Sequence, residues 1–318
     1  MTPTPPIIRR SLEVAGRRVS YLTIDDVTNS NTDSVGGVTA RDTLLLIHGA
    51  GVSARTWVNQ LRGLAGVVRP IAIDLPGRRE SDAADPTLAT YADTAYETLR
   101  RLHSGPAFVA GHSLGGAVAQ VLAERHPDVV KGLVLISTCA SMPPADGATR
   151  VLGSVPWPFR RAVLQWVARR TLFAPCAPPD AVRLTLDELR ECRVSTIQSD
   201  TAMGQAIDLE GVAQRLRVPT LILCGERDAL TAPALSERLG VLIAGSWLQI
   251  VPAAGHMLPL EAPELVNRAL ADFVHAVTRT AAVAGAPPVA TRRYDLRGAA
   301  QRLVEMLWRR PWRSATET

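Results

Sequence analysis

The sequence predicts an α/β protein with a mostly parallel sheet and helices on both faces. Two observations lead to this prediction: short apolar runs rich in β-branched residues recur along the chain, and segments of helical periodicity separate them. The chain has 318 residues, of which 47% are hydrophobic and 20% charged, as in a globular protein with a sizeable core.

The predicted elements follow in order along the chain. An antiparallel hairpin is expected first, from residues 11–14 and 18–23 around an Ala-Gly turn, and then a polar surface loop at 25–42. Buried strands are predicted at residues 43–47, 69–73, 107–110, 132–137, 220–224 and 247–251. Helices are predicted at residues 57–64, 90–102, 114–125, 232–239 and 261–277.

One long interval breaks this alternation. Between residues 137 and 220 the chain has several prolines and helical patterns at 160–172 and 180–192, which is too much structure for a linker. Because the interval follows the carboxyl end of a strand, we expect a helical insertion over the crevice where open α/β sheets bind ligands.

The net charge of +5 is confined to the end of the chain. Residues 279–318 contain eight arginines and three acidic residues, whereas positive and negative charges balance over residues 1–278. The main domain is therefore not expected to bind nucleic acid. No apolar run is long enough to span a membrane, and the charged N-terminus does not resemble a signal peptide, so we expect a cytoplasmic protein.

Metal and cofactor chemistry is not expected. The four cysteines lie far apart without C-x-x-C spacing, and the six histidines show no H-E-x-x-H or other paired ligand spacing. We therefore predict a protein that works without a metal or a cofactor.

Ser113 is the candidate nucleophile. It lies in G-H-S-L-G, directly after a predicted strand and before a predicted helix, which is the strand, turn, helix context of a nucleophile elbow. Glycines at 111 and 115 leave room for a sharp turn, and the N–H of Leu114 at the helix start would point at a developing oxyanion.

The base and the acid are expected further along the chain. A serine needs a base oriented by a third group, and in this architecture the order is serine, then acid, then histidine. Asp228 follows the strand at 220–224, and His256 follows the strand at 247–251. The second oxyanion donor is expected from the loop after residue 47, as the Ala50 N–H with Gly51 as the alternative.

Together these segments resemble the α/β-hydrolase family over roughly residues 9–278. The matching pieces are H-G-A-G-V-S-A-R-T-W at 48–57, D-L-P-G at 74–77, G-H-S-L-G-G at 111–116, G-E-R-D at 225–228 and G-H at 255–256. The resemblance implies an α/β-hydrolase fold with an eight-stranded sheet, a helical lid at about 141–210, and a triad of Ser113, Asp228 and His256. The sequence departs from the family after D-L-P-G, where Arg79 replaces a residue that is often glycine.

The expected function is a serine hydrolase of small to medium carboxylic esters. Glu226 is the alternative acid, and capping of the helix predicted at 232 is the alternative role for Asp228. Lactonase and perhydrolase activities stay open, as does a ligand-binding protein on the same fold. Carbon–carbon bond hydrolases and proline iminopeptidases are less favoured, because Val52, Leu114 and Met257 stand where their typical residues would be.

The tail at 279–318 is predicted to be a linker followed by a basic amphipathic helix. Residues 281–290 are rich in alanine, glycine and proline, and residues 296–310 place leucines along one helical face among arginines. Docking on its own domain, contact with a membrane surface and contact with a protein partner all remain open interpretations.

Overall fold

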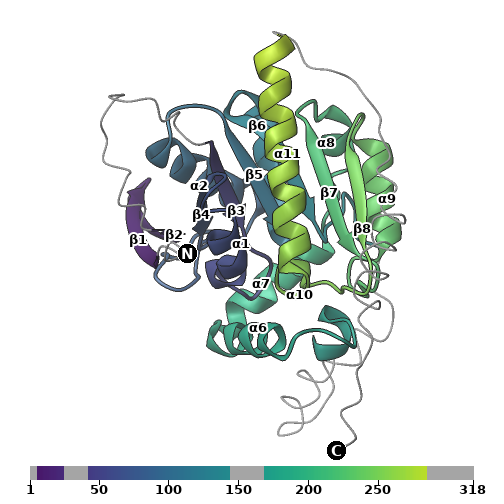
Figure 1. Cartoon of the computed structure of the whole chain (residues 1–318). Helices are drawn as coiled ribbons and strands as arrows, with labels where there is room; N and C mark the ends of the chain where they lie inside the picture. Colours follow the sequence, from purple (N-terminus) through teal and green to yellow (C-terminus); the bar gives the residue numbers. More distant parts are fainter. Residues whose placement is uncertain (1–5, 25–41, 144–167, 285–318) are drawn as a thin grey trace, which may run out of the picture.

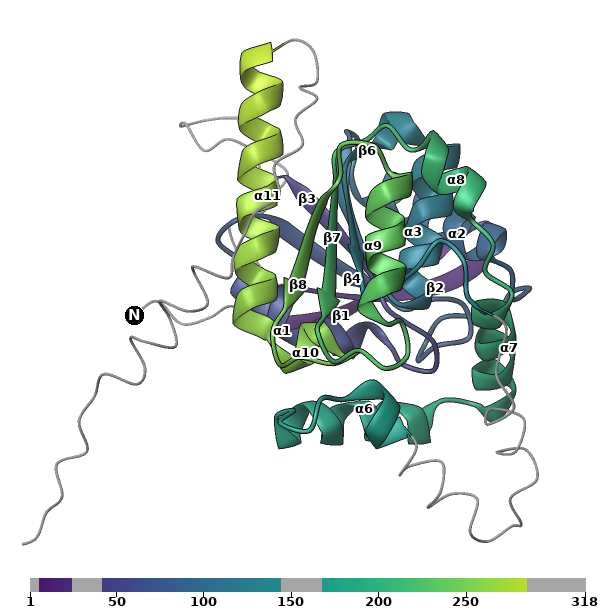
Figure 2. The same cartoon turned by 90° about the vertical axis from the view of Figure 1, so that its right-hand side faces the viewer.

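The computed structural model describes residues 6–24, 42–143 and 168–284, with side chains up to residue 280. Within these residues the chain forms an eight-stranded sheet between two layers of helices (Figures 1 and 2). The predicted α/β class, mostly parallel sheet and helices on both faces are confirmed.

The sheet has the strand order β1-β2-β4-β3-β5-β6-β7-β8. Strand β2 is antiparallel to both of its neighbours, and all other neighbouring strands are parallel. The strands are β1 (Ile7–Val14), β2 (Arg17–Ile24), β3 (Thr43–Ile47), β4 (Arg69–Ile73), β5 (Ala107–His112), β6 (Val130–Ile136), β7 (Thr220–Gly225) and β8 (Trp247–Val251). The predicted hairpin and all six predicted strands are present, although β8, at the edge of the sheet, is only partly buried and not buried as predicted.

Helices cover both faces of this sheet. Figure 2 shows α1 and α11 on one face and α2, α3 and α9 on the other. The helices are η1 (Ala54–Trp57), α1 (Val58–Gly63), α2 (Leu88–Leu102), α3 (Leu114–Arg125), η2 (Pro127–Val129), α6 (Pro179–Glu191), α7 (Val194–Gln205), α8 (Glu210–Arg215), α9 (Pro233–Leu242), α10 (Leu258–Glu261) and α11 (Pro263–Ala284).

The sheet divides the hydrophobic core into two clusters, one on each face, and strand β3 contributes side chains to both. Leu44 and Leu46 pack with Trp57 on the α1 and α11 face, whereas Leu45 and Ile47 pack into the cluster on the α2 and α3 face. Side chains alternate across a strand, so a strand covered on both faces has to be apolar throughout. Each such leucine contributes roughly 1.5–3 kcal/mol by its burial.

The interval between β6 and β7 is a helical insertion. Figures 1 and 2 show α6 and α7 beyond the end of the sheet where α10 lies. The two ends of the insertion are side by side, because Ser141 forms an antiparallel bridge with Asp208. The predicted helix at 180–192 is present as α6, whereas α7 and α8 were not predicted. Most of the helix predicted at 160–172 lies outside the described residues.

Helix α11 ends later than predicted. It runs to Ala284, so residues 279–284 are helical, and the linker that we expected from residue 279 does not begin there. Residues 281–284 are Ala-Ala-Val-Ala, and alanine is the strongest helix former. The amphipathic helix predicted at 296–310 lies outside the described residues. None of the described helices is both long and apolar enough to cross a membrane.

Candidate active site

Three loops meet at the carboxyl ends of neighbouring strands. Ser113 follows the last residue of β5 directly, Asp228 lies three residues after β7, and His256 lies five residues after β8. Because β5, β6, β7 and β8 are adjacent and parallel, these loops leave the sheet at the same edge. That edge is where open α/β sheets bind their ligands.

The structure joins the three predicted residues in one chain of hydrogen bonds. The Oγ of Ser113 lies 3.0 Å from Nε2 of His256. The Nδ1 of His256 lies 2.9 Å from Oδ2 and 3.2 Å from Oδ1 of Asp228. A carboxylate only accepts, so Nδ1 carries the hydrogen and Nε2 is left to accept from the serine hydroxyl.

Ser113 is held in a sharp turn between β5 and α3. Its φ of +53° lies in the left-handed region, which is uncommon for residues other than glycine. The turn requires a close approach of α3 to β3: a Cβ on Gly115 would clash with the carbonyl oxygens of Ile47 and His48. This tight packing sustains the strain, and backbone strain of this kind is common at functional sites.

Asp228 is buried and fully hydrogen bonded. Its Oδ1 accepts from the backbone N–H groups of Leu230 and Thr231, at 2.9 and 2.8 Å, and its Oδ2 accepts from the Thr231 hydroxyl at 2.8 Å. Burial alone would raise the pKa of Asp228, but His256 and the bonds from Thr231 outweigh it and hold that pKa below its usual value.

The positions of Glu226 and of the α9 N-cap bear on the alternatives left open for the acid. The Oε2 of Glu226 accepts from the Ala253 N–H at 3.1 Å, in place of a bond to the imidazole. The N-cap of α9 is Ala232, with no side-chain cap, so Asp228 does not cap that helix. Thr231 was not predicted as a site residue, and its Oγ1 also lies 3.2 Å from Nδ1 of His256.

The two expected oxyanion donors, the N–H groups of Leu114 and Ala50, belong to segments that lie beside Ser113. Leu114 is the first residue of α3, and the loop carrying Ala50 lies against the serine, since a Cβ on Gly49 would be 3.1 Å from Ser113 Cβ. Among the described residues, neither amide donates to a protein acceptor. The Gly51 N–H is already used, because it donates to Oδ2 of Asp200 at 3.0 Å, which removes Gly51 as the alternative donor.

Two further histidines support these loops. The Nε2 of His48 accepts from the Leu75 N–H at 3.0 Å, so its Nδ1 donates to the Gly49 oxygen at 2.8 Å, as expected of a histidine that holds its loop. The Nε2 of His112 lies 2.8 Å from the His256 carbonyl oxygen, to which it donates. Burial lowers the pKa of His48 to about 4 and that of His112 to about 3.

We predict that these two neutral histidines make the fold acid-sensitive. The unfolded chain takes up protons at both near pH 6.5, whereas the folded chain does not until about pH 4 or below. The free energy of unfolding should therefore fall as the pH drops below 6.5, by up to about 1.4 kcal/mol per pH unit for each histidine. Urea unfolding at pH 7.5, 6.0 and 4.5 measures this slope.

A matched pair of variants tests the assignment. His112→Gln keeps a side-chain amide that donates to the His256 oxygen but does not titrate, so its slope should be smaller than that of the parent protein. His275 is exposed, and His275→Gln should leave the slope unchanged. Equal slopes in His112→Gln and the parent would contradict the prediction.

Arg79, which stands where the family often has glycine, keeps the left-handed backbone conformation of the loop after β4. Arg79 has a φ of +48°, the left-handed conformation that a glycine adopts without strain, and this costs roughly 1–2 kcal/mol in other residues. Its guanidinium forms ion pairs with Glu188 and Glu191 of α6, so the side chain ties this loop to the insertion. These contacts offset part of the backbone cost.

The strand order, the elbow and the three loops define a class of enzyme. Residues 44–269 match the alpha/beta hydrolase family, which is well over half of the chain. The chain therefore belongs to the alpha/beta hydrolase family.

Esterases and other hydrolases are among the relatives of this chain. A pimeloyl-[acyl-carrier protein] methyl ester esterase of Neisseria meningitidis serogroup A is 30% identical over 257 residues, covering 76% of this chain and 81% of that protein. An (E)-2-((N-methylformamido)methylene)succinate hydrolase of Acinetobacter baylyi is 25% identical over 234 residues, covering 71% and 88%. A solved thermophilic esterase is 30% identical with a TM-score of 0.70, covering 86% and 99%. They support ester hydrolysis in general for this chain.

Proposed function

We propose that this protein is a serine hydrolase that cleaves carboxylic esters of small to medium hydrophobic substrates through an acyl-enzyme. The observation that carries the proposal is the continuous hydrogen-bonded chain from Ser113 Oγ through His256 to Asp228. The esterases among its relatives support the ester as the bond that is cleaved.

Acylation begins with the transfer of a proton from Ser113 Oγ to Nε2 of His256. The serine oxygen attacks the ester carbonyl carbon, and the carbonyl electron pair moves onto oxygen, where the Leu114 and Ala50 N–H groups stabilise it. One such donor is worth roughly 2.7–4 kcal/mol of the barrier. Asp228 stabilises the imidazolium and holds it in orientation.

In the later steps His256 acts first as an acid and then again as a base. His256 gives its proton to the leaving alcohol as the carbon–oxygen bond breaks, which leaves the acyl group on Ser113. Water then loses a proton to Nε2 and attacks the acyl carbon, and the collapse of the second tetrahedral intermediate returns the proton to Ser113. His112 keeps the backbone of His256 in place through both steps, by its bond to the His256 oxygen.

Apolar side chains beside the site support a hydrophobic substrate. Met257, next to the proposed base, is buried in a cluster with Phe173, Val182 and Leu260. Phe173 and Val182 come from the insertion and Leu260 from α10, so the cluster joins the insertion to the loop of His256. Apolar walls with a few placed polar groups are typical of small-molecule sites.

Fluorophosphonate labelling tests the nucleophile. We expect the native protein to be labelled at Ser113, because only an activated serine displaces the fluoride, and Ser113→Ala to be unlabelled. Ser137 is the matched control: it directly follows β6, has a φ of +47° and is buried. Ser137→Ala should be labelled like the parent. Absence of label on Ser113 in the folded parent would favour a ligand-binding protein on this fold.

A further inference from the structure

Buried side chains fix both peptide planes that flank Ala50. A trans peptide is planar, with its C=O and N–H pointing in opposite directions, so a bond to one group sets the direction of the other. In the plane between Gly49 and Ala50, the carbonyl oxygen is held by Nδ1 of His48 at 2.8 Å. The direction of the Ala50 N–H is thereby fixed from one side.

The next peptide plane is held by the insertion. The N–H of Gly51 donates to Oδ2 of Asp200, a side chain of α7 that is fully buried. Gly51 has a φ of +70°, and a Cβ there would lie 2.8 Å from Cδ2 of Leu189 on α6. The chain thus passes through residue 51 in a conformation and a space that suit glycine, with its amide directed at the carboxylate.

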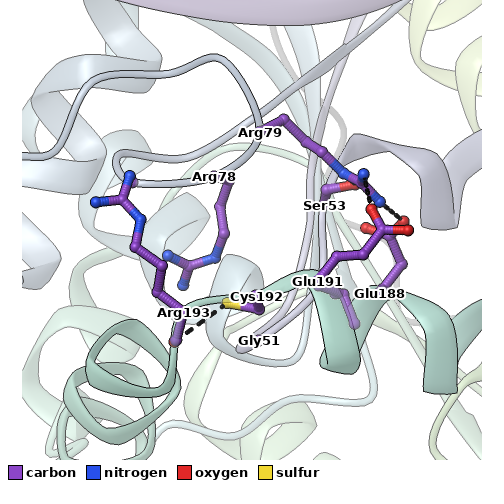
Figure 3. Close-up of a pocket in the computed structure, with 10 residues that line it drawn as sticks. Gly51, Ser53, Arg78, Arg79, Glu188, Glu191, Cys192 and Arg193 are labelled. Carbon is purple, nitrogen blue, oxygen red and sulfur yellow. Dashed lines mark hydrogen bonds and ion pairs between the residues drawn. The ribbon is translucent and has the colours of Figure 1, made fainter.

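Asp200 is itself firmly held. Its Oδ2 forms an ion pair with Nη2 of Arg78, and the two side chains are 0% and 2% exposed. The Tyr91 hydroxyl lies 3.4 Å from Oδ1, and burial together with Asp200 raises the pKa of Tyr91 to about 12, so the hydroxyl keeps its proton at neutral pH. Figure 3 shows Arg78 extending toward the junction of α6 and α7 at Cys192 and Arg193, beside Gly51.

We propose that Asp200 is a positioning residue for the oxyanion hole. It holds the peptide between Ala50 and Gly51, so the insertion helix α7 helps to set the direction of the Ala50 N–H toward the transition state. The inference rests on the proposed function, in which Ala50 is an oxyanion donor. It assigns to the insertion a part in catalysis.

A purely structural ion pair is the competing explanation, and the chain offers a control for it. The ion pair between Arg79 and Glu191 also joins the insertion to the loop after β4, but it has no bond to the backbone of residues 48–51. Glu191→Gln should therefore leave kcat and KM within about twofold of the parent values, since exposed ion pairs contribute little.

Three changes at Asp200 separate positioning from stability. Asp200→Ala removes the acceptor, and we expect kcat for a p-nitrophenyl ester to fall by roughly 10- to 100-fold with little change in KM, less than for loss of a donor itself. Asp200→Asn keeps an oxygen for the Gly51 N–H, so it should stay within about fivefold of the parent kcat. The double variant Arg78→Met with Asp200→Leu replaces the buried pair by apolar groups, which is often neutral for stability. It should fold stably and still show the low kcat.

The ratio of the affinities for two inhibitors tests the oxyanion hole separately from the stability of the fold. Ser113 Oγ adds to the carbonyl carbon of an alkyl trifluoromethyl ketone, and the carbonyl oxygen becomes an oxyanion. The matching trifluoromethyl alcohol has no carbonyl and forms no such adduct. Asp200→Ala and the double variant should bind the ketone 10- to 100-fold more weakly and the alcohol unchanged. If the double variant recovers kcat, or if ketone and alcohol weaken equally, Asp200 is structural and the proposal is overturned. Ester hydrolysis by the unmutated enzyme, and its loss in Ser113→Ala, test the proposed function separately from the role of Asp200.

Discussion

Replacing Ser113 by alanine is expected to lower kcat for a p-nitrophenyl ester by roughly 10⁴- to 10⁶-fold, because the variant loses the atom that forms the acyl-enzyme. The elbow places Oγ 3.0 Å from Nε2 of the imidazole, and among the described residues no other hydroxyl contacts that nitrogen; the Thr231 hydroxyl lies beside Nδ1 instead. What remains should be the acceleration that the two amides and substrate binding provide for attack by water. Single-turnover and steady-state release of p-nitrophenol measure the loss.

The variant should remain folded, so the loss can be assigned to chemistry. The contacts that hold residue 113 are made by its backbone: its N–H donates to the Ile136 oxygen at 2.9 Å, and its own carbonyl accepts from the Thr138 hydroxyl at 2.8 Å. Alanine keeps both bonds. The urea midpoint should therefore stay close to that of the parent. Parental turnover in a folded Ser113→Ala protein would show that another group is the nucleophile.

The sheet and the three meeting loops could be predicted because their signals are local. The bounds of β3, β4 and β8 agree with the prediction, since a short apolar run between turn residues indicates a strand, buried in β3 and β4 and partly buried in β8. Ser113, Asp228 and His256 each follow such a strand closely. A parallel sheet then brings these positions to one edge, whatever the chain does between them.

The insertion could be predicted only in part. Helix α7 has the sequence V-S-T-I-Q-S-D-T-A-M-G-Q, in which serine, threonine, aspartate and glycine are weak helix formers, so its periodicity gives little signal. It is held by tertiary contacts, among them the bond from Asp200 to Gly51, which joins residues 149 positions apart. A single sequence does not indicate such a pair, and the role of Asp200 emerges only from the fold.

Thr231 illustrates the same limit at short range. Its N–H and hydroxyl both donate to Asp228, three positions earlier, so the spacing itself is a signal for a side-chain turn. The sequence places several polar residues near Asp228, however, and only the structure shows which of them bond to the carboxylate. The same contacts hold the Asp228 carboxylate against the imidazole.

Replacing Asp228 by asparagine should cost about 10⁴-fold in kcat, with the shape of the site kept. The asparagine side chain presents either an N–H₂ donor or a neutral oxygen to Nδ1 of His256. The tautomer that carries its hydrogen on Nδ1 and leaves Nε2 free to accept therefore loses its anionic partner. The Thr231 hydroxyl, 3.2 Å from Nδ1, offers only a neutral oxygen in its place. KM should change little, because Asp228 is buried behind the imidazole and is not expected to touch substrate.

Glu226→Gln is the matched control for this prediction. Glu226 lies two residues before Asp228 in the same loop, and a glutamine oxygen can still accept from the Ala253 N–H. Its kcat should stay within about threefold of the parent value, as expected for a surface change. Measured with one ester at one pH, the pair separates charge at residue 228 from disturbance of the loop. Equal losses in the two variants would mean that the loop, and not the buried carboxylate, sets the activity of His256.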